Sequence, residues 1–251
     1  MNRYFLEVSY IGTHYAGFQV QKNANTVQAE IEKALTILLR KNIILTGSSR
    51  TDAGVHALQN YFHFDHEESV ASETIYNMNA LLPHDISVNN LIAVEPDNHC
   101  RFDAIARLYA YHLYRFKNPF LTDRAYYYPY PVDIGRLQEA AEILYSYRDY
   151  RAFSKRRTQV QNYNCMIIES RWSVENGQLI YHVKGNRFLR GMVRGLVGTM
   201  LHVGKGKMPL HEFRKIIEEK DQSVVDFSVP AKGLFLKEVI FPENYFHDNK
   251  K

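Results

Sequence analysis

Segments with the two-residue period of a β-strand alternate along this chain with segments that have the period of an α-helix. Residues 4–10 alternate apolar and polar side chains, and the apolar side chains of residues 27–38 recur at helical spacing. The second half repeats this theme, with a helix over 133–144 followed by a hairpin. We therefore predict an α/β fold of the α+β type, with mixed, largely antiparallel sheets that helices cover on one side.

The predicted elements divide the chain near residue 100. We expect residues 1–100 to form an N-terminal α/β half and residues 101–251 a C-terminal half. The side chain of Asn25, together with Gln28, is predicted to cap the first helix. Asn176-Gly177 predicts the turn of the later hairpin. The other predicted elements are strands over 42–46, 60–64, 86–94, 167–174, 179–183 and 234–241, and helices over 72–81, 189–201 and 209–217.

Residues 50–57 place a carboxylate between an arginine and a glycine. Asp52 follows Arg50 by two residues and precedes Gly54 by two, on a loop between two predicted strands. A charge-assisted bond and a sharp turn can keep such a carboxylate ionised and aimed, as catalysis requires. An ordinary turn, in which the Asp side chain bonds the backbone two residues on, explains the same spacing. The spacing alone favours the ordinary turn.

Composition limits the class of protein. The chain has 251 residues, 45% hydrophobic content and no apolar run of membrane length, so we expect a globular protein without a membrane span. No signal sequence precedes the first strand-like residues, so we expect a cytoplasmic location. Cys100 and Cys165 lie far apart in the sequence, which predicts reduced core thiols and no disulfide.

No metal and no cofactor are predicted. His63, Asp65 and His66 lie close together in one predicted strand, but no second, distant pair of ligands accompanies them. We interpret them as polar residues at the solvent edge of that strand. The Gly-Lys repeat of residues 204–207 lacks the spacing of a phosphate-binding loop. His56 is interpreted as a hydrogen-bonded structural residue.

Two runs of basic residues interleaved with aromatic residues predict contact with RNA. The formal net charge of +4 gives only a weak general attraction to polyanions. Cationic and aromatic side chains together suit phosphates and unstacked bases, although each run alone fits a solvated loop or a strand equally well. The first run contains Arg148, Arg151, Lys155, Arg156 and Arg157, with Tyr150 and Phe153; the second contains Arg101, Arg107, Arg115 and Lys117, with Tyr109, Tyr111 and Tyr114.

Small residues mark one face of the helix predicted over 189–201. Gly191, Gly195, Gly198 and His202 lie opposite its apolar stripe. Each glycine inside a helix costs about 1 kcal/mol relative to alanine, so another element is expected to approach this face closely. Packing within the same subunit is the favoured interpretation, and contact with a second subunit is the alternative.

Several segments, in order along the chain, resemble one family. Residues 47–57, with the triplet Arg-Thr-Asp, resemble the signature of the tRNA pseudouridine synthase A (TruA) family. Residues 10–19 resemble its early Tyr-x-Gly-Thr segment, with Phe18 in place of the usual Trp. Ser48 and Ser49 stand where Ala and Gly are common. Further matching segments are residues 104–111, 185–189, 192–194 and 233–236.

The resemblance implies an enzyme that isomerises uridine to pseudouridine in the anticodon stem and loop of tRNA, at positions 38, 39 and 40. It implies two similar halves with a catalytic cleft between them, a homodimer, and Asp52 as the catalytic nucleophile. It places Arg50 in the space left by the flipped base and Tyr109 against that base. Arg194 and Leu234 are expected as further substrate-binding residues.

The reaction needs few groups. The base leaves a ribose carbon through nitrogen and rejoins it through carbon, so no atom is lost and no redox cofactor is required. From the residues alone, Asp52 can attack the ribose or the base, or remove a ribose proton. The target nucleotide must first leave the helix stack. The alternatives are a non-catalytic RNA-binding module of the same fold and a glycosidase that removes the base.

Overall fold

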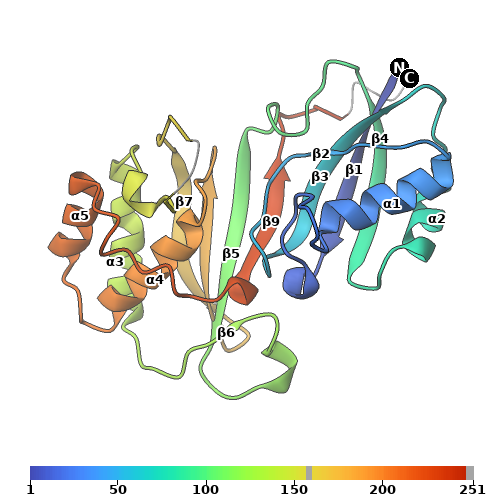
Figure 1. Ribbon diagram of the computed structural model, residues 1–251. Coiled ribbons are helices and arrows are strands. Elements are labelled where there is room, and N and C mark those ends of the chain that lie inside the picture. Colours follow the sequence, from blue (N-terminus) through green and yellow to red (C-terminus); the bar gives the residue numbers. More distant parts are fainter. Residues whose placement is uncertain (157–159, 247–251) are drawn as a thin grey trace. The chain divides into compact units, whose positions relative to one another are not determined.

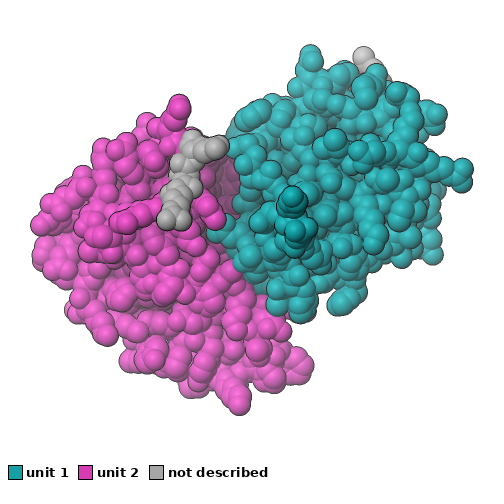
Figure 2. Space-filling view, viewed as in Figure 1, with its two compact units in different colours: residues 1–105, 235–251 teal, residues 106–234 magenta. Residues whose placement is uncertain are grey.

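The computed structural model describes residues 1–156 and 160–246, so Arg157 of the first basic run lies outside the described residues. The chain forms two compact units, one of residues 1–105 and 235–251 and one of residues 106–234 (Figure 2). The expected division into residues 1–100 and 101–251 stays a prediction about domains. The compact units differ from it, because residues 101–105 and the C-terminal strand count with the first unit.

The first unit contains a mixed sheet with the strand order β4-β1-β3-β9, in which β2 also pairs with β3. The β1 strand pairs antiparallel with β3 and with β4, whereas β9 runs parallel to β3. The predicted mixed, largely antiparallel α/β architecture is confirmed in this unit. Its strands are β1 (Asn2–Tyr10), β2 (Thr46–Gly47), β3 (His56–His66), β4 (Ile86–Val94) and β9 (Leu234–Ile240), and its helices are η1 (Gly12–His14), α1 (Val27–Leu39) and α2 (Thr74–Leu81).

Alternation in β1 and β3 places aromatic side chains on both faces of this sheet. Leu6 is opposite Phe62 in the register, and the Phe62 ring stacks on Phe18 with centroids 4.4 Å apart. On the other face Phe5 contacts the ring of Phe241, with centroids 5.9 Å apart, and those of Tyr245 and Phe246. Helix α2 packs against α1 and β4 (Figure 1). Apolar groups therefore cover the central strands on both sides.

The predicted cap of α1 and the predicted length of the strand that follows it are both wrong. The N-cap is Thr26, not Asn25, since the Thr26 hydroxyl accepts a bond from the backbone N–H of Ala29. Gln28 instead donates to the carbonyl oxygen of Leu45 at 2.8 Å. This bond also explains why the strand predicted over 42–46 is reduced to the two residues of β2. The side chains of Gln28 and Glu32 on α1 bond the backbone of Leu45 in place of a sheet partner.

The second unit contains a sheet with the order β5-β8-β7, all antiparallel, and a short β6 parallel to β5. Asn176 and Gly177 both have positive φ, 50° and 74°, which confirms the predicted hairpin turn. Its strands are β5 (Ala106–Tyr114), β6 (Tyr126–Tyr127), β7 (Ile167–Glu175) and β8 (Gln178–Gly185); its helices are α3 (Ile134–Ile143), α4 (Met192–Gly204), α5 (Leu210–Glu219), η2 (Pro119–Leu121), η3 (Leu144–Ser146), η4 (Arg151–Phe153) and η5 (Ala231–Gly233).

Helices α3, α4 and α5 pack on one another, and α3 packs against β7 (Figure 1). Among the helices in the described parts of both units, none combines the length and the apolar character needed to cross a membrane.

Close packing within the second unit explains two of the glycines in α4. A Cβ on Gly198 would lie 2.2 Å from the carbonyl oxygen of Asp226, and one on Gly195 would lie 2.8 Å from the Phe227 ring. His202, on the same face, bonds the Asp226 carboxylate through Nε2 at 3.1 Å. Gly191 serves differently, as the N-cap residue with φ of 74°. The favoured interpretation, packing inside one subunit, is confirmed at Gly195 and Gly198.

We predict that Gly198→Ala lowers the free energy of unfolding by at least about 1–3 kcal/mol. The new methyl group would overlap the backbone carbonyl group of Asp226. The matched control is Gly135→Ala in α3, where a Cβ meets only a side-chain oxygen of Asp133 at 3.2 Å. That variant should be unchanged or up to about 1 kcal/mol more stable. Urea unfolding measures both. Equal stability of the two variants would contradict this account of α4.

Candidate active site and basic surface

The Asp52 loop lies in the first unit, between β2 and β3. The backbone N–H of Val55 donates to the carbonyl oxygen of Asp52 at 3.1 Å, and Gly54 has φ of 76°. The segment is therefore a tight turn, which was the ordinary interpretation of its spacing. The Asp52 side chain is half-buried, and the neighbouring Arg50 is exposed.

The N-terminal segment holds this loop through Thr51. The Thr51 carbonyl oxygen accepts a bond from the backbone N–H of Phe18 at 3.1 Å, and its hydroxyl bonds the hydroxyl of Tyr10 at 2.8 Å. Gly17 has φ of 108°, and a Cβ there would lie 3.1 Å from the same carbonyl oxygen. Residues 10–18 thus fix the backbone immediately before Asp52.

A second set of contacts fixes the backbone after Asp52. The N–H of Gly12 donates to Nδ1 of the fully buried His56 at 3.1 Å. A Cβ on Gly12 would lie 2.0 Å from the carbonyl oxygen of Val55, so this approach requires glycine. The His56 ring also contacts Phe235, with centroids 4.5 Å apart. The structural role predicted for His56 is confirmed.

The residues before Arg50 are anchored to β3. Asn60 donates through Nδ2 to the carbonyl oxygen of Ser49 at 2.9 Å and to the Tyr10 hydroxyl at 3.2 Å. The hydroxyl groups of Ser48 and Ser49 are buried and bond no partner among the described residues. These are the positions where the resemblance leads us to expect small side chains. The fold therefore needs a small side chain at both positions, and it makes no use of the hydroxyl groups.

The other predicted pocket residues belong to the second unit. Tyr109 lies on β5, and its ring meets Phe188 edge to face, with centroids 5.0 Å apart. This contact joins residues 104–111 to residues 185–189, two of the segments that carried the resemblance.

Arg194 on α4 holds the segment that leads to Leu234. Its Nε donates to the carbonyl oxygen of Val229 at 2.8 Å, and Nη2 donates to that of Phe227 at 3.3 Å. From β5, the Tyr111 hydroxyl donates to the carbonyl oxygen of Pro230 at 2.7 Å. Leu234 itself is buried. The matched segments of this unit therefore support one another, as those around Asp52 do in the first.

Three residues of the first basic run line one hollow of about 300 Å³. Arg151, Lys155 and Arg156 meet there with Lys220 and Tyr163, which the sequence did not suggest because they lie apart from the run. The Arg151 guanidinium stacks over the Tyr163 ring, 4.7 Å from its centroid. Arg156 donates to Gln222 at 2.9 Å, and Lys220 pairs with Asp149 at 2.9 Å.

Arg148 does not line the hollow. Its Nη1 donates to the carbonyl oxygens of Tyr145 and Tyr147 at 3.3 and 3.1 Å. Arg148, predicted as an RNA-binding residue, thus has a local structural role in the chain.

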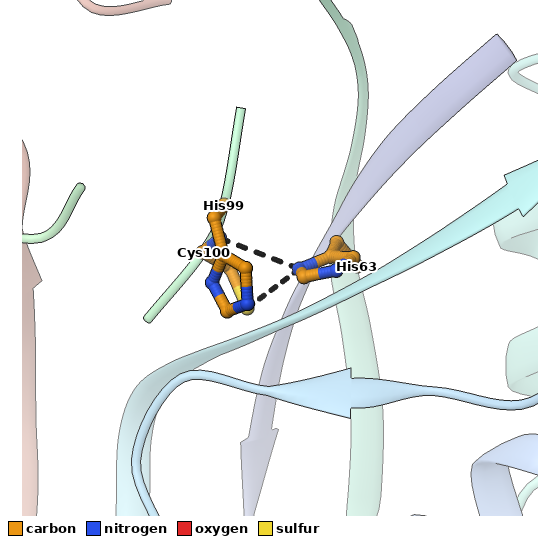
Figure 3. Close-up of side chains that lie close together, drawn as sticks. All are labelled: His63, His99 and Cys100. Carbon is orange, nitrogen blue, oxygen red and sulfur yellow. Dashed lines mark hydrogen bonds between the residues drawn. The ribbon is translucent and has the colours of Figure 1, made fainter. Parts of the chain in front are cut away.

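The interpretation of His63 and His66 as polar residues at a solvent edge is wrong. At His63 the β3 strand pairs with β1 on one side and with β2 on the other, and both histidines are 6% exposed. Asp65 forms a bidentate pair with Arg3, at 2.7 and 2.8 Å. His63 instead gathers with His99 and Cys100, whose potential ligand atoms all lie within 4.8 Å of one another (Figure 3). No sequence pattern indicated this group, since His63 and His99 lie 36 positions apart.

The bonds of this group decide against a ready-made metal site. Backbone N–H groups of Arg101 and Phe102 donate to Nδ1 of His99, so the hydrogen of its neutral ring lies on Nε2. Neither nitrogen of His99 then offers a free lone pair to a cation. Nδ1 of His63 contacts Sγ of Cys100 at 3.2 Å, and that thiol donates to the carbonyl oxygen of Thr46. Cys100 and Cys165 are both buried free thiols, as predicted.

Burial of this group makes stability depend on pH. Desolvation, with smaller contributions from His99 and Arg3, lowers the pKa of His63 to about 4. Between about pH 6.5 and 4 the unfolded chain therefore binds a proton that the folded protein does not. We predict that the free energy of unfolding falls by up to about 3 kcal/mol as the pH is lowered through this window.

Denaturation at several pH values measures the effect. His63→Gln should flatten the pH dependence, whereas His14→Gln, a change at an exposed histidine, should leave it unchanged. The assignment is wrong if the wild type and His63→Gln lose stability in parallel.

Comparison with known proteins gives one family. The model of a family described as tRNA pseudouridine synthase matches residues 7–103 and 140–242. A protein named tRNA pseudouridine synthase A from Parabacteroides distasonis is 41% identical over 98% of this chain and 98% of its own. Proteins of the same name from Bacteroides thetaiotaomicron and Staphylococcus aureus strain Newman are 42% and 36% identical, over 100% and 96% of this chain and 95% and 92% of their own.

Proposed function

This chain belongs to the tRNA pseudouridine synthase A family, and on that premise we propose that Asp52 is the catalytic nucleophile of uridine isomerisation in the anticodon stem and loop. The family makes the protein an isomerase that acts on uridine in tRNA. The proposal adds the residue and the region of the tRNA, with positions 38, 39 and 40 as targets.

Hydrogen bonds restrain the backbone on both sides of Asp52, and this restraint supports the proposal. Thr51 is bonded by Phe18 and Tyr10, and His56 is bonded by Gly12. A carboxylate that has to meet one atom of a flipped nucleotide gains rate from being positioned before the substrate arrives. An ordinary surface turn needs none of these contacts. The turn and the proposed catalytic site are thus the same structure.

The reaction requires few other groups from the protein. One carbon–nitrogen bond to the ribose breaks, and one carbon–carbon bond to the same ribose carbon forms. The base loses a proton from carbon and gains one on nitrogen, so atoms and electrons balance without a redox partner. The Asp52 carboxylate serves as the nucleophile, and it is released when the new bond forms.

The other predicted pocket residues fit supporting roles. The exposed Arg50 side chain can enter the space that the extruded base leaves. The Tyr109 ring, which meets Phe188 edge to face, is an aromatic group against which a base can stack. Arg194 acts as a positioning residue through its two bonds to the chain before Leu234.

The hollow lined by Arg151, Lys155, Arg156 and Lys220 suits the phosphates of the tRNA. Cationic side chains next to Tyr163 give the mixture of charge and ring that RNA recognition uses. A tRNA substrate also supports the expected cytoplasmic location. The homodimer implied by the resemblance is proposed with it.

We predict that Asp52→Ala abolishes pseudouridine formation but keeps tRNA affinity within about tenfold, or roughly 1.4 kcal/mol. The reason is that the proposed role of Asp52 lies in the reaction and not in holding the RNA. The assay is single-turnover conversion of a purified tRNA transcript, with binding measured on the same transcript. Asp97→Ala, which removes an exposed carboxylate, is the matched control and should react at the wild-type rate.

The alternatives give other results. A non-catalytic RNA-binding module would bind tRNA without product in the wild type as well. Continued pseudouridine formation by Asp52→Ala would sink the role assigned to this residue.

A further inference from the structure

The loop that leaves β5 exposes two phenylalanines. Phe116 and Phe120 are 82% and 85% exposed, the two largest fractions among the large apolar side chains of the described residues. Solvent-exposed phenylalanine rings contribute nothing to the core, so a pair of them on one short loop indicates a surface that is covered in use. The pocket chemistry proposed for Asp52 and Tyr109 uses neither ring.

The loop is ordered by its own bonds. The Asn118 side chain accepts a bond from the backbone N–H of Phe120 at 2.9 Å and so caps η2, which begins with Pro119. The backbone N–H of Ala125 donates to the carbonyl oxygen of Leu121 at 3.0 Å. After it, β6 pairs with β5. The rings are therefore presented by a pre-formed turn, which lowers the entropic cost of binding.

The surroundings of the rings are cationic. A hollow of about 420 Å³ is lined by Phe116 and Phe120 and by the cationic residues Arg115 and Lys117. The turn of the β7–β8 hairpin completes this hollow at Asn176. None of the described residues that line this hollow carries a carboxylate. The nearest acid along the hairpin, Glu175, is bonded to Ser173 and His182.

Rings, cations and amides in one concave surface match the chemistry of unpaired nucleotides. Bases stack on aromatic rings and on guanidinium planes, and their phosphates pair with the cations. The centre of a surface between two copies of the chain is instead depleted of lysine and other charged residues, arginine excepted, whereas Lys117 lines this hollow together with Arg115. Charge complementarity thus favours RNA as the occupant.

The hollow is too far from Tyr109 to hold the target base. The β5 strand carries five residue steps from Tyr109 to Tyr114, where the hollow begins. At about 3.3 Å per residue this is roughly 17 Å.

We propose that the hollow lined by residues 114–121 and 176–177 is a second nucleotide-binding site, which stacks unpaired bases of the substrate tRNA at a distance from the target uridine. The proposal rests on tRNA being the substrate. Phe116 and Phe120 are the stacking platforms, and Arg115 and Lys117 neutralise the adjoining phosphates.

The test is the affinity for an unmodified tRNA transcript, measured by fluorescence anisotropy at fixed salt. The double variant Phe116→Ala/Phe120→Ala should bind at least about tenfold more weakly, or roughly 1.4 kcal/mol. Phe116→Tyr/Phe120→Tyr, which keeps both rings, should bind within about twofold of the wild type. Tyr76→Ala removes an aromatic ring that is 80% exposed on α2, and this matched control should bind normally.

Two further readouts separate this site from the active site. At saturating enzyme, the single-turnover rate of the double alanine variant should equal that of the wild type, because Asp52 is untouched. Circular dichroism should show an unchanged fold, since the rings lie outside the core. A failure of the wild type to make pseudouridine would overturn the proposed function, and the loss of affinity would still report this site.

Two results would overturn the proposal. One is wild-type affinity in the double alanine variant. The other is a fall in solution mass from two chains to one in that variant, which would make the surface a contact between copies.

Discussion

Hydrogen bonds between residues 10–18 and the Asp52 loop are the contacts on which the proposed activity depends. They act through backbone groups and through side chains that are buried, namely Tyr10, Thr51 and His56. Gly12 and Gly17 occur where any Cβ would meet the backbone of residues 51–55. A chain that needed only a turn at this place would tolerate larger residues at both positions. Two glycines cost conformational entropy on folding, and the gain is a carboxylate that is held in position before the substrate binds.

The second unit is organised by the same means. Arg194 from α4 and Tyr111 from β5 bond the carbonyl groups of residues 227, 229 and 230, and glycines of α4 let residues 225–227 approach. Cationic side chains are grouped separately, in the hollow around Arg156 and in the loop after β5. Residues that set geometry are therefore distinct from residues that attract a polyanion.

Sequence periodicity was sufficient to predict the α/β class, most helices and the Asn176-Gly177 hairpin, because these depend on local patterns of apolar side chains. It failed at residues 42–45, where contacts from α1 replace a sheet partner, and at the N-cap of that helix. The Asp52 loop was located through its resemblance to a family, whereas its restraint by Gly12 and Tyr10 needs coordinates. The same holds for Lys220 in the basic hollow and for the group of His63, His99 and Cys100. Contacts between residues distant in the chain leave no local pattern.

The most direct measurement is the fate of uridine in a purified tRNA transcript incubated with the protein in the presence of a metal chelator. We expect that uridines of the anticodon stem and loop become pseudouridine, mapped position by position, and that no free uracil is released. Release of uracil would show a glycosidase instead. An unmodified transcript, or a reaction that stops when metal is removed, would contradict an isomerase that works through the carboxylate of Asp52.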